Sequence, residues 1–194
     1  MDKQLHSEND LTDVRAVRPL PQTSWIYLSA VILCTGLLIW TTNYVLVQRN
    51  VDQASGSDAR NSGYRLSAHY RYYIDPSTLI LDLRISKAAP LDLLRGLFQS
   101  AGALASAGRN FDRVILARSG TPIFIMAGKE FSQLGAEFSG GQNPAFLIRA
   151  LPEMLYTPSG KPAFGRWEAG MPGALEKQMS DANEASKAWS GAKP

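Results

Sequence analysis

The feature that most restricts how this chain can fold is an apolar stretch near its N-terminus. From Trp25 to Val47 there are 23 residues without Asp, Glu, Lys, Arg or His. At about 1.5 Å of rise per residue, a helix of this length is about 34 Å long, which is enough to cross the hydrocarbon core of a bilayer. Trp25 and Tyr27 lie near one end and Trp40 and Tyr44 near the other, as in the aromatic belts of membrane interfaces. The stretch therefore predicts a single transmembrane helix at 25–47.

Two other interpretations of this stretch are less consistent with the sequence. A cleaved signal peptide would have a shorter apolar region, and the best small residue after the stretch, Ala54, has Asp52 where a signal peptidase needs a small side chain. A buried core helix would rarely combine this length with a complete lack of charge. We therefore expect an uncleaved anchor.

The arginines that flank the stretch do not decide its orientation. Arg15 and Arg18 precede it and Arg49 and Arg60 follow it, so the positive-inside count is equal on the two sides. We expect the short polar tail, residues 1–24, to be cytoplasmic and the large domain to be extracytoplasmic, because a compact domain without cysteine suits an oxidising compartment. This describes a single-pass protein of the cell (inner) membrane.

Charge and cysteine usage narrow the classes of partner and cofactor. The formal net charge of the chain is +3 and its arginines form no run, so we expect no nucleic-acid partner. Cys34 is the only cysteine and it lies in the apolar stretch, so the domain has no disulfide and no cysteine-based zinc site, and we expect neither a metal nor a cofactor. Ala30 and Cys34, one turn apart, are either ordinary small residues of the helix or a contact that allows homo-oligomers to form through the span.

After the apolar stretch, the sequence predicts a flexible polar linker at 48–63 and an α+β domain at 64–194. The linker is rich in Ser, Asn, Gly and Asp and has no apolar period. The domain is expected to have the order ββαββααα, with a small and mostly antiparallel sheet.

The first predicted hairpin begins with a strict alternation of apolar and polar residues over 64–74. An Asp-Pro-Ser turn follows, and then a second alternating strand. Pairing Ile74 with Leu79 keeps both apolar sets on one face, and the same register places His69 opposite Arg84.

Helical and strand signals then alternate along the rest of the domain. A helical stripe after Pro90 is expected to cover the hairpin, and a second hairpin over 112–128 is expected to supply two central strands because both of its faces are apolar. Three helices complete the domain. The first is predicted to face inward with Phe131, Leu134 and Phe138, the second carries Phe146, Leu147 and Leu151, and the third has one shared face formed by Leu175, Met179, Ala182, Ser186 and Trp189.

The domain contains no recognisable catalytic motif. His69 is its only histidine and is expected on a solvated strand face. Glu130 and Glu137 share a helix face as an acid and base would, but exposed charges opposite an apolar stripe explain them equally. The enzymatic alternative is therefore a membrane-tethered hydrolase of envelope polymers that uses Glu168 or Glu130 as its acid.

The strongest functional signal is the Gly- and Pro-rich loop at 157–173. Long irregular loops in compact domains often bind ligands or partners, and Phe164, Arg166, Trp167 and Glu168 combine aromatic and charged side chains of the kind that anchor protein interfaces. The alternative is that Trp167 folds back onto the core. The sequence thus favours a membrane-anchored, non-enzymatic interaction or scaffold module, an accessory subunit of a cell-envelope assembly with a protein partner.

Overall fold

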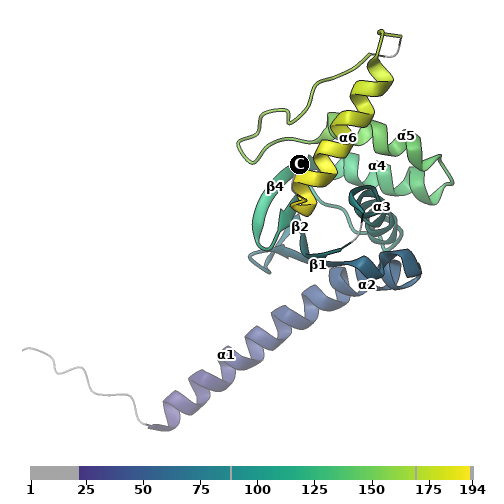
Figure 1. Ribbon diagram of the computed structural model, residues 1–194. Helices are drawn as coiled ribbons and strands as arrows, with labels where there is room; N and C mark the ends of the chain where they lie inside the picture. Colours follow the sequence, from purple (N-terminus) through teal and green to yellow (C-terminus); the bar gives the residue numbers. More distant parts are fainter. Residues whose placement is uncertain (1–21, 88, 169, 193–194) are drawn as a thin grey trace, which may run out of the picture. The chain divides into compact units, whose positions relative to one another are not determined.

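The computed structural model describes residues 22–87, 89–168 and 170–192, and over these residues the chain is α+β with a four-stranded mixed sheet (Figure 1). Most of the expected polar tail lies outside the described residues. Two compact units are present, Met1–Leu37 and Leu38–Pro194. The elements in chain order are α1 (Gln22–Asn43), the π-helical turn η1 (Tyr44–Gln48), α2 (Arg49–Gly56), the 3-10 turn η2 (Ala59–Gly63), β1 (Tyr64–Arg71), β2 (Asp75–Ser86), α3 (Pro90–Ser106), β3 (Arg113–Arg118), β4 (Thr121–Ala127), α4 (Gly128–Ser139), α5 (Pro144–Ala150), the 3-10 turn η3 (Leu151–Met154) and α6 (Ala174–Ser190).

The apolar stretch is helical throughout. Among the described residues, one helix is long and apolar enough to cross a membrane, and it runs over Ser24–Gly56. Ala30 and Cys34 lie on this helix with exposed side chains.

The segment 48–63 differs from the flexible linker that its composition suggested. It is helical in α2 and η2, and Val47 and Val51, one turn apart, have no exposed surface. Two apolar residues spaced by four are too few to give a visible period in a polar sequence, yet they are enough to dock a short helix on a core. The turn η1 closes with the Arg49 N–H donating to the Tyr44 carbonyl, five residues back, as in a π-bulge.

The first hairpin has the predicted faces but a different register. Tyr70 pairs with Leu79 and His69 with Ile80, so the strands are shifted by four residues from the expected pairing of Ile74 with Leu79, and His69 is not opposite Arg84. The turn lies at Tyr72 and Tyr73, which both have positive φ, as a type I′ turn requires. A shift by an even number keeps every side chain on its face, so the apolar pattern fits both registers.

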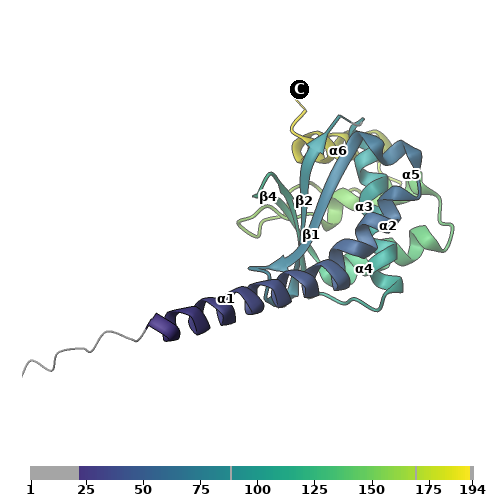
Figure 2. The ribbon, with the colours of Figure 1, turned by 90° about the horizontal axis from the view of Figure 1, so that it is seen from below.

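The sheet has the order β1-β2-β3-β4. The β1–β2 and β3–β4 pairs are antiparallel, while β2 and β3 are parallel and are connected through α3. Helices α3 and α4 lie on one side of the sheet (Figures 1 and 2). They approach closely at Gly135, where a Cβ atom would come within 2.4 Å of the Ala101 carbonyl carbon.

Strand β3 is central and buried, as expected, but β4 is an edge strand rather than a central one. Its outer side is bridged by Tyr156, whose N–H donates to the Ile125 carbonyl and whose carbonyl accepts from the Ile125 N–H, both at 2.8 Å. A single bridge of this kind covers only part of an edge, so Ile123 and Ile125 remain partly exposed. Because Tyr156 covers part of its outer side, β4 carries apolar side chains on both faces although it is an edge strand.

Helix α6 buries only the second half of its predicted apolar face. Trp189 is 1% exposed and its indole N–H donates to the Ala117 carbonyl of β3 at 2.8 Å. Leu175 and Met179, near the start of α6, are exposed although they share the predicted face with Trp189, and Phe146 on α5 is exposed as well. These three side chains lie on α5 and α6, next to the 157–173 loop.

Candidate functional site

The first candidate site is a groove of about 530 Å³ between α5, α6 and the loop, which we call the α5–α6 groove. Helix α5 is capped by Asn143, whose Oδ1 accepts the Ala145 N–H at 2.9 Å, and α6 begins after Gly173, which is in the left-handed conformation. The groove is lined by Phe146, Arg149, Ala150, Glu153, Trp167, Gly170, Met171, Ala174, Leu175 and Gln178.

Trp167 forms part of the groove wall and is held in place from three sides. Its indole N–H donates to Asp181 Oδ2 at 2.7 Å, the Lys177 ammonium lies 4.3 Å from its ring centroid, and its carbonyl accepts from Gln178 Nε2 at 3.3 Å. The ring is half-buried on α6, so it folds back on the domain, as the alternative interpretation of the loop supposed, while still lining the groove. A side chain fixed in this way loses little conformational entropy when a partner covers it.

The side chains of the other three residues predicted in the loop lie in different environments. Phe164 packs on Phe124 of β4, with ring centroids 5.8 Å apart, and is partly buried against the core. Arg166 and Glu168 are exposed on either side of Trp167. The loop thus brings Trp167 to the groove, places two charges at the surface and uses Phe164 in packing.

Three exposed apolar side chains line the α5–α6 groove. Phe146 is 49% exposed, Met171 48% and Leu175 57%. The Arg149 guanidinium lies 5.6 Å from the Phe146 ring centroid, which adds a cation beside the apolar surface. A pre-formed concave surface with aromatic, methionine and arginine side chains is typical of protein interfaces.

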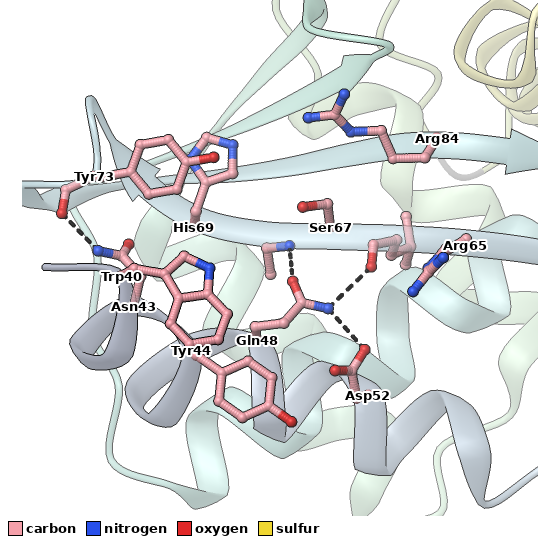
Figure 3. A pocket seen from close by; sticks show the side chains of 12 residues that line it. Trp40, Asn43, Tyr44, Gln48, Asp52, Arg65, Ser67, His69, Tyr73 and Arg84 are labelled. Atoms are coloured by element: carbon pink, nitrogen blue, oxygen red, sulfur yellow. Dashed lines mark hydrogen bonds between the residues drawn. The ribbon is translucent and has the colours of Figure 1, made fainter. Parts of the chain in front are cut away.

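The second candidate site is a cavity of about 440 Å³ beside the edge strand β1, which we call the β1-edge pocket (Figure 3). One wall is the helical segment that contains Trp40, Asn43, Tyr44, Gln48 and Asp52. The other wall consists of the β1–β2 hairpin residues Arg65, Leu66, Ser67, Ala68, His69, Tyr73 and Arg84.

Two amide side chains hold this pocket together by completing the hydrogen bonding of β1. Asn43 Oδ1 accepts the Tyr70 N–H at 2.9 Å and its Nδ2 donates to the Tyr73 carbonyl at 2.6 Å. Gln48 Oε1 accepts the Ala68 N–H at 2.6 Å, and its Nε2 donates to Asp52 at 2.7 Å (Figure 3). These contacts satisfy an edge strand that would otherwise expose unpaired backbone groups.

The β1-edge pocket was not predicted from the sequence, because Asn43 was included in the transmembrane stretch 25–47 and Gln48 in the flexible linker 48–63. The signal that was available is their spacing. Asn43 and Gln48 are five residues apart, and the π-helical turn between them, with its i to i+5 hydrogen bond, places both on the β1 side. A π-bulge cannot be read from composition, so the shared face was not apparent.

The side chains considered for catalysis do not converge. Glu130 on α4 is half-buried, Glu137 accepts from Gln133 at 2.8 Å, and Glu168 is exposed in the loop; none of them lines the groove or the pocket. His69 lines the β1-edge pocket, stacked on Tyr73 with ring centroids 4.5 Å apart. Within the described ranges, no group of three or more His, Cys, Asp and Glu side chains is arranged to hold a metal ion.

Comparison of the chain with protein-family models, with curated proteins and with solved structures gives no match.

Proposed function

We propose that this chain is a membrane-anchored, non-enzymatic interaction module, an accessory subunit of a cell-envelope assembly. Its apolar helix is the anchor, its domain is extracytoplasmic, and the α5–α6 groove binds a protein partner. A core helix of a water-soluble protein would be mostly buried, whereas 11% of the most apolar 18-residue window of this helix is buried. This supports lipid as the surrounding of the helix.

The observation that carries the partner-binding proposal is the set of exposed apolar side chains at the groove. Leu175 and Met179 lie on the face of α6 that continues, further along, into the buried Ala182 and Trp189. A helix face that is apolar along its whole length but covered along only half of it marks a contact surface. Trp167 and Arg149 beside it are of the residue types that contribute most to interface free energy.

The test is crosslinked co-purification of the full-length chain from mild detergent. The variant Met171→Gln/Leu175→Gln replaces two exposed side chains and leaves Trp167 and its bond to Asp181 intact. We expect at least about tenfold less of the wild-type partner polypeptide to be recovered, since loss of interface anchors costs about 2 kcal/mol or more.

The matched control is Glu184→Gln, an exposed change on the same helix outside the groove. Its partner recovery is expected to equal that of the wild type. If the double variant folds and recovers the same partner in the same amount, the groove is not the binding surface.

A further inference from the structure

The β1-edge pocket contains anion-binding side chains that the proposed partner binding does not use. Arg65 is exposed and has no ion-pair partner among the described residues. Arg84 Nε lies 2.9 Å from Asp82 Oδ2, and Asp82, which is 1% exposed, also accepts the Gly120 N–H. The buried Asp82 carboxylate therefore holds the Arg84 side chain in position. Two guanidinium groups at one cavity favour a phosphate or carboxylate ligand.

His69 and Ser67 add polar groups to the same strand face (Figure 3). His69 Nδ1 lies 2.9 Å from the Tyr70 carbonyl oxygen, so Nδ1 carries the proton that it donates there, and Nε2 remains for another contact. The Ser67 side chain lies between Arg65 and His69 on β1 and is partly exposed. The one carboxylate that lines the pocket, Asp52, accepts from Gln48.

The pocket lies at the domain end of the apolar helix. The last turns of the stretch 25–47 contribute Trp40, Asn43 and Tyr44 to the pocket, and Gln48 directly follows the stretch. The Trp40 and Tyr44 rings are stacked with centroids 5.7 Å apart. Aromatic rings in this position mark the level of the lipid headgroups.

The tip of the β1–β2 hairpin independently indicates the same level. Tyr72, Tyr73 and Ile74 are all exposed, and the bond from Asn43 Nδ2 to the Tyr73 carbonyl ties the tip to the helix. Directly after the tip, the Ser77 hydroxyl donates to Asp75 at 2.6 Å and holds the pKa of that carboxyl below its usual value. Amphipathic tyrosine rings beside a carboxylate whose charged form is favoured are suited to the interface rather than to the hydrocarbon core.

We propose that the β1-edge pocket binds the phosphodiester group of a membrane phospholipid, with Arg65 and Arg84 on the phosphate oxygens and Ser67 as a further donor. The Trp40 and Tyr44 rings contact the glycerol and upper acyl region of the same lipid. The volume of about 440 Å³ is in the range of ordinary ligand sites, about 300–1,000 Å³. This inference rests on the proposed membrane anchor, and it adds a specific lipid site to it.

The experiment uses the full-length chain in dodecyl maltoside micelles with added dioleoylphosphatidylglycerol, and native mass spectrometry counts the lipid that the chain retains. We expect Arg65→Gln to reduce the affinity for this lipid about tenfold, because a charge-assisted contact to phosphate is lost. Ser67→Ala is expected to give a smaller loss. The control Arg113→Gln, an exposed arginine of β3 that does not line the pocket, is expected to bind as the wild type does.

A parallel arm with inorganic phosphate distinguishes a lipid from a free anion. We expect millimolar inorganic phosphate to leave lipid retention unchanged, and complete displacement of the lipid would overturn the lipid assignment. Equal retention by the wild type, Arg65→Gln and Ser67→Ala would overturn the site. A wild-type chain that remains in solution without detergent would contradict the membrane anchor itself, whereas a detergent-dependent chain with unaltered lipid binding in the variants would contradict the pocket alone.

Discussion

Gly135 shows how one residue fixes the distance between two helices. A Cβ atom at this position would lie 2.4 Å from the Ala101 carbonyl carbon and 2.5 Å from the Gly102 nitrogen, both backbone atoms of α3. Backbone atoms in the middle of a helix cannot move aside as a flexible side chain can. The close contact of α3 and α4, which carries Leu104, Phe131 and Leu134 into the core, therefore depends on the absence of a side chain here.

We predict that Gly135→Ala lowers the free energy of unfolding by about 1–3 kcal/mol, the usual cost of overpacking. For a chain of this size the apparent melting temperature is expected to fall by about 2–4 °C per kcal/mol, which circular dichroism of the detergent-solubilised chain measures. The control is Gly56→Ala in α2, where no atom lies within 4 Å of the added Cβ and where helix propensity favours Ala. A Gly135→Ala protein as stable as the control would show that α3 and α4 are not in contact at this point.

At the scale of elements, η1 and α2 dock on the edge strand β1. The side chains of Asn43 and Gln48 act as a partial extra strand, and Val47 and Val51 pack beneath them. Asn43 is 4% exposed, and its amide donates to the Ile39 and Tyr73 carbonyls while its oxygen accepts from Tyr70. A buried amide with its hydrogen bonds satisfied in this way is stabilising rather than costly.

We predict that Gln48→Ala increases hydrogen exchange at the Ala68 amide about three- to tenfold, the effect of losing one acceptor worth about 1 kcal/mol. Hydrogen–deuterium exchange of the full chain, resolved at the β1 peptide, measures this change. The matched control is Asn50→Ala, because Asn50 Nδ2 donates to the Leu46 carbonyl of its own helix. If the Ala68 amide exchanges at the wild-type rate in Gln48→Ala, the helix is not docked on β1 in solution.

The elements also show which features can be predicted from the sequence. The alternation of β1 and β2 predicted both strands and their buried faces, because a period of two is a local property. The alternation could not predict the register, because a shift of four residues leaves every side chain on the same face. The sequence also indicated a turn at Asp75 and Pro76, whereas the turn lies at Tyr72 and Tyr73, and tyrosine rarely adopts the positive φ found there.

Contacts between distant segments account for the other differences. Residues 48–63 are polar and were expected to be flexible, but Gln48 bonds to β1, and Asp58 lies 3.0 Å from Arg95 of α3. On α6, the apolar residues form one continuous stripe, so the sequence does not show that the first half of the stripe has no element of the domain packed on it. Trp167 was identified from the loop composition, whereas Phe146 and Leu175, which complete the groove, were noted only as apolar residues of their helices. Each of these outcomes depends on tertiary neighbours that composition does not specify.

At the scale of the whole molecule, the chain divides into three stretches with different proposed tasks. We propose that the stretch 25–47 anchors the protein, that the β1-edge pocket holds a phospholipid at the headgroup level, and that the α5–α6 groove binds a protein partner. The segment 44–56 is helical, and Val47 and Val51 within it belong to the core of the domain.

The central claim is that the stretch 25–47 is embedded in lipid, and the sole cysteine of the chain, Cys34, allows a direct measurement. Membranes that contain the full-length protein are opened by freeze–thaw and treated with a water-soluble maleimide, with and without denaturing detergent. The comparison protein is Cys34→Ser carrying Glu184→Cys on the exposed side of α6. We predict that Cys34 reacts only after detergent is added, whereas the Glu184→Cys comparison protein reacts in both conditions. Labelling of Cys34 to the same extent with and without detergent, or recovery of the chain in the soluble fraction, would contradict the embedding of the stretch in lipid.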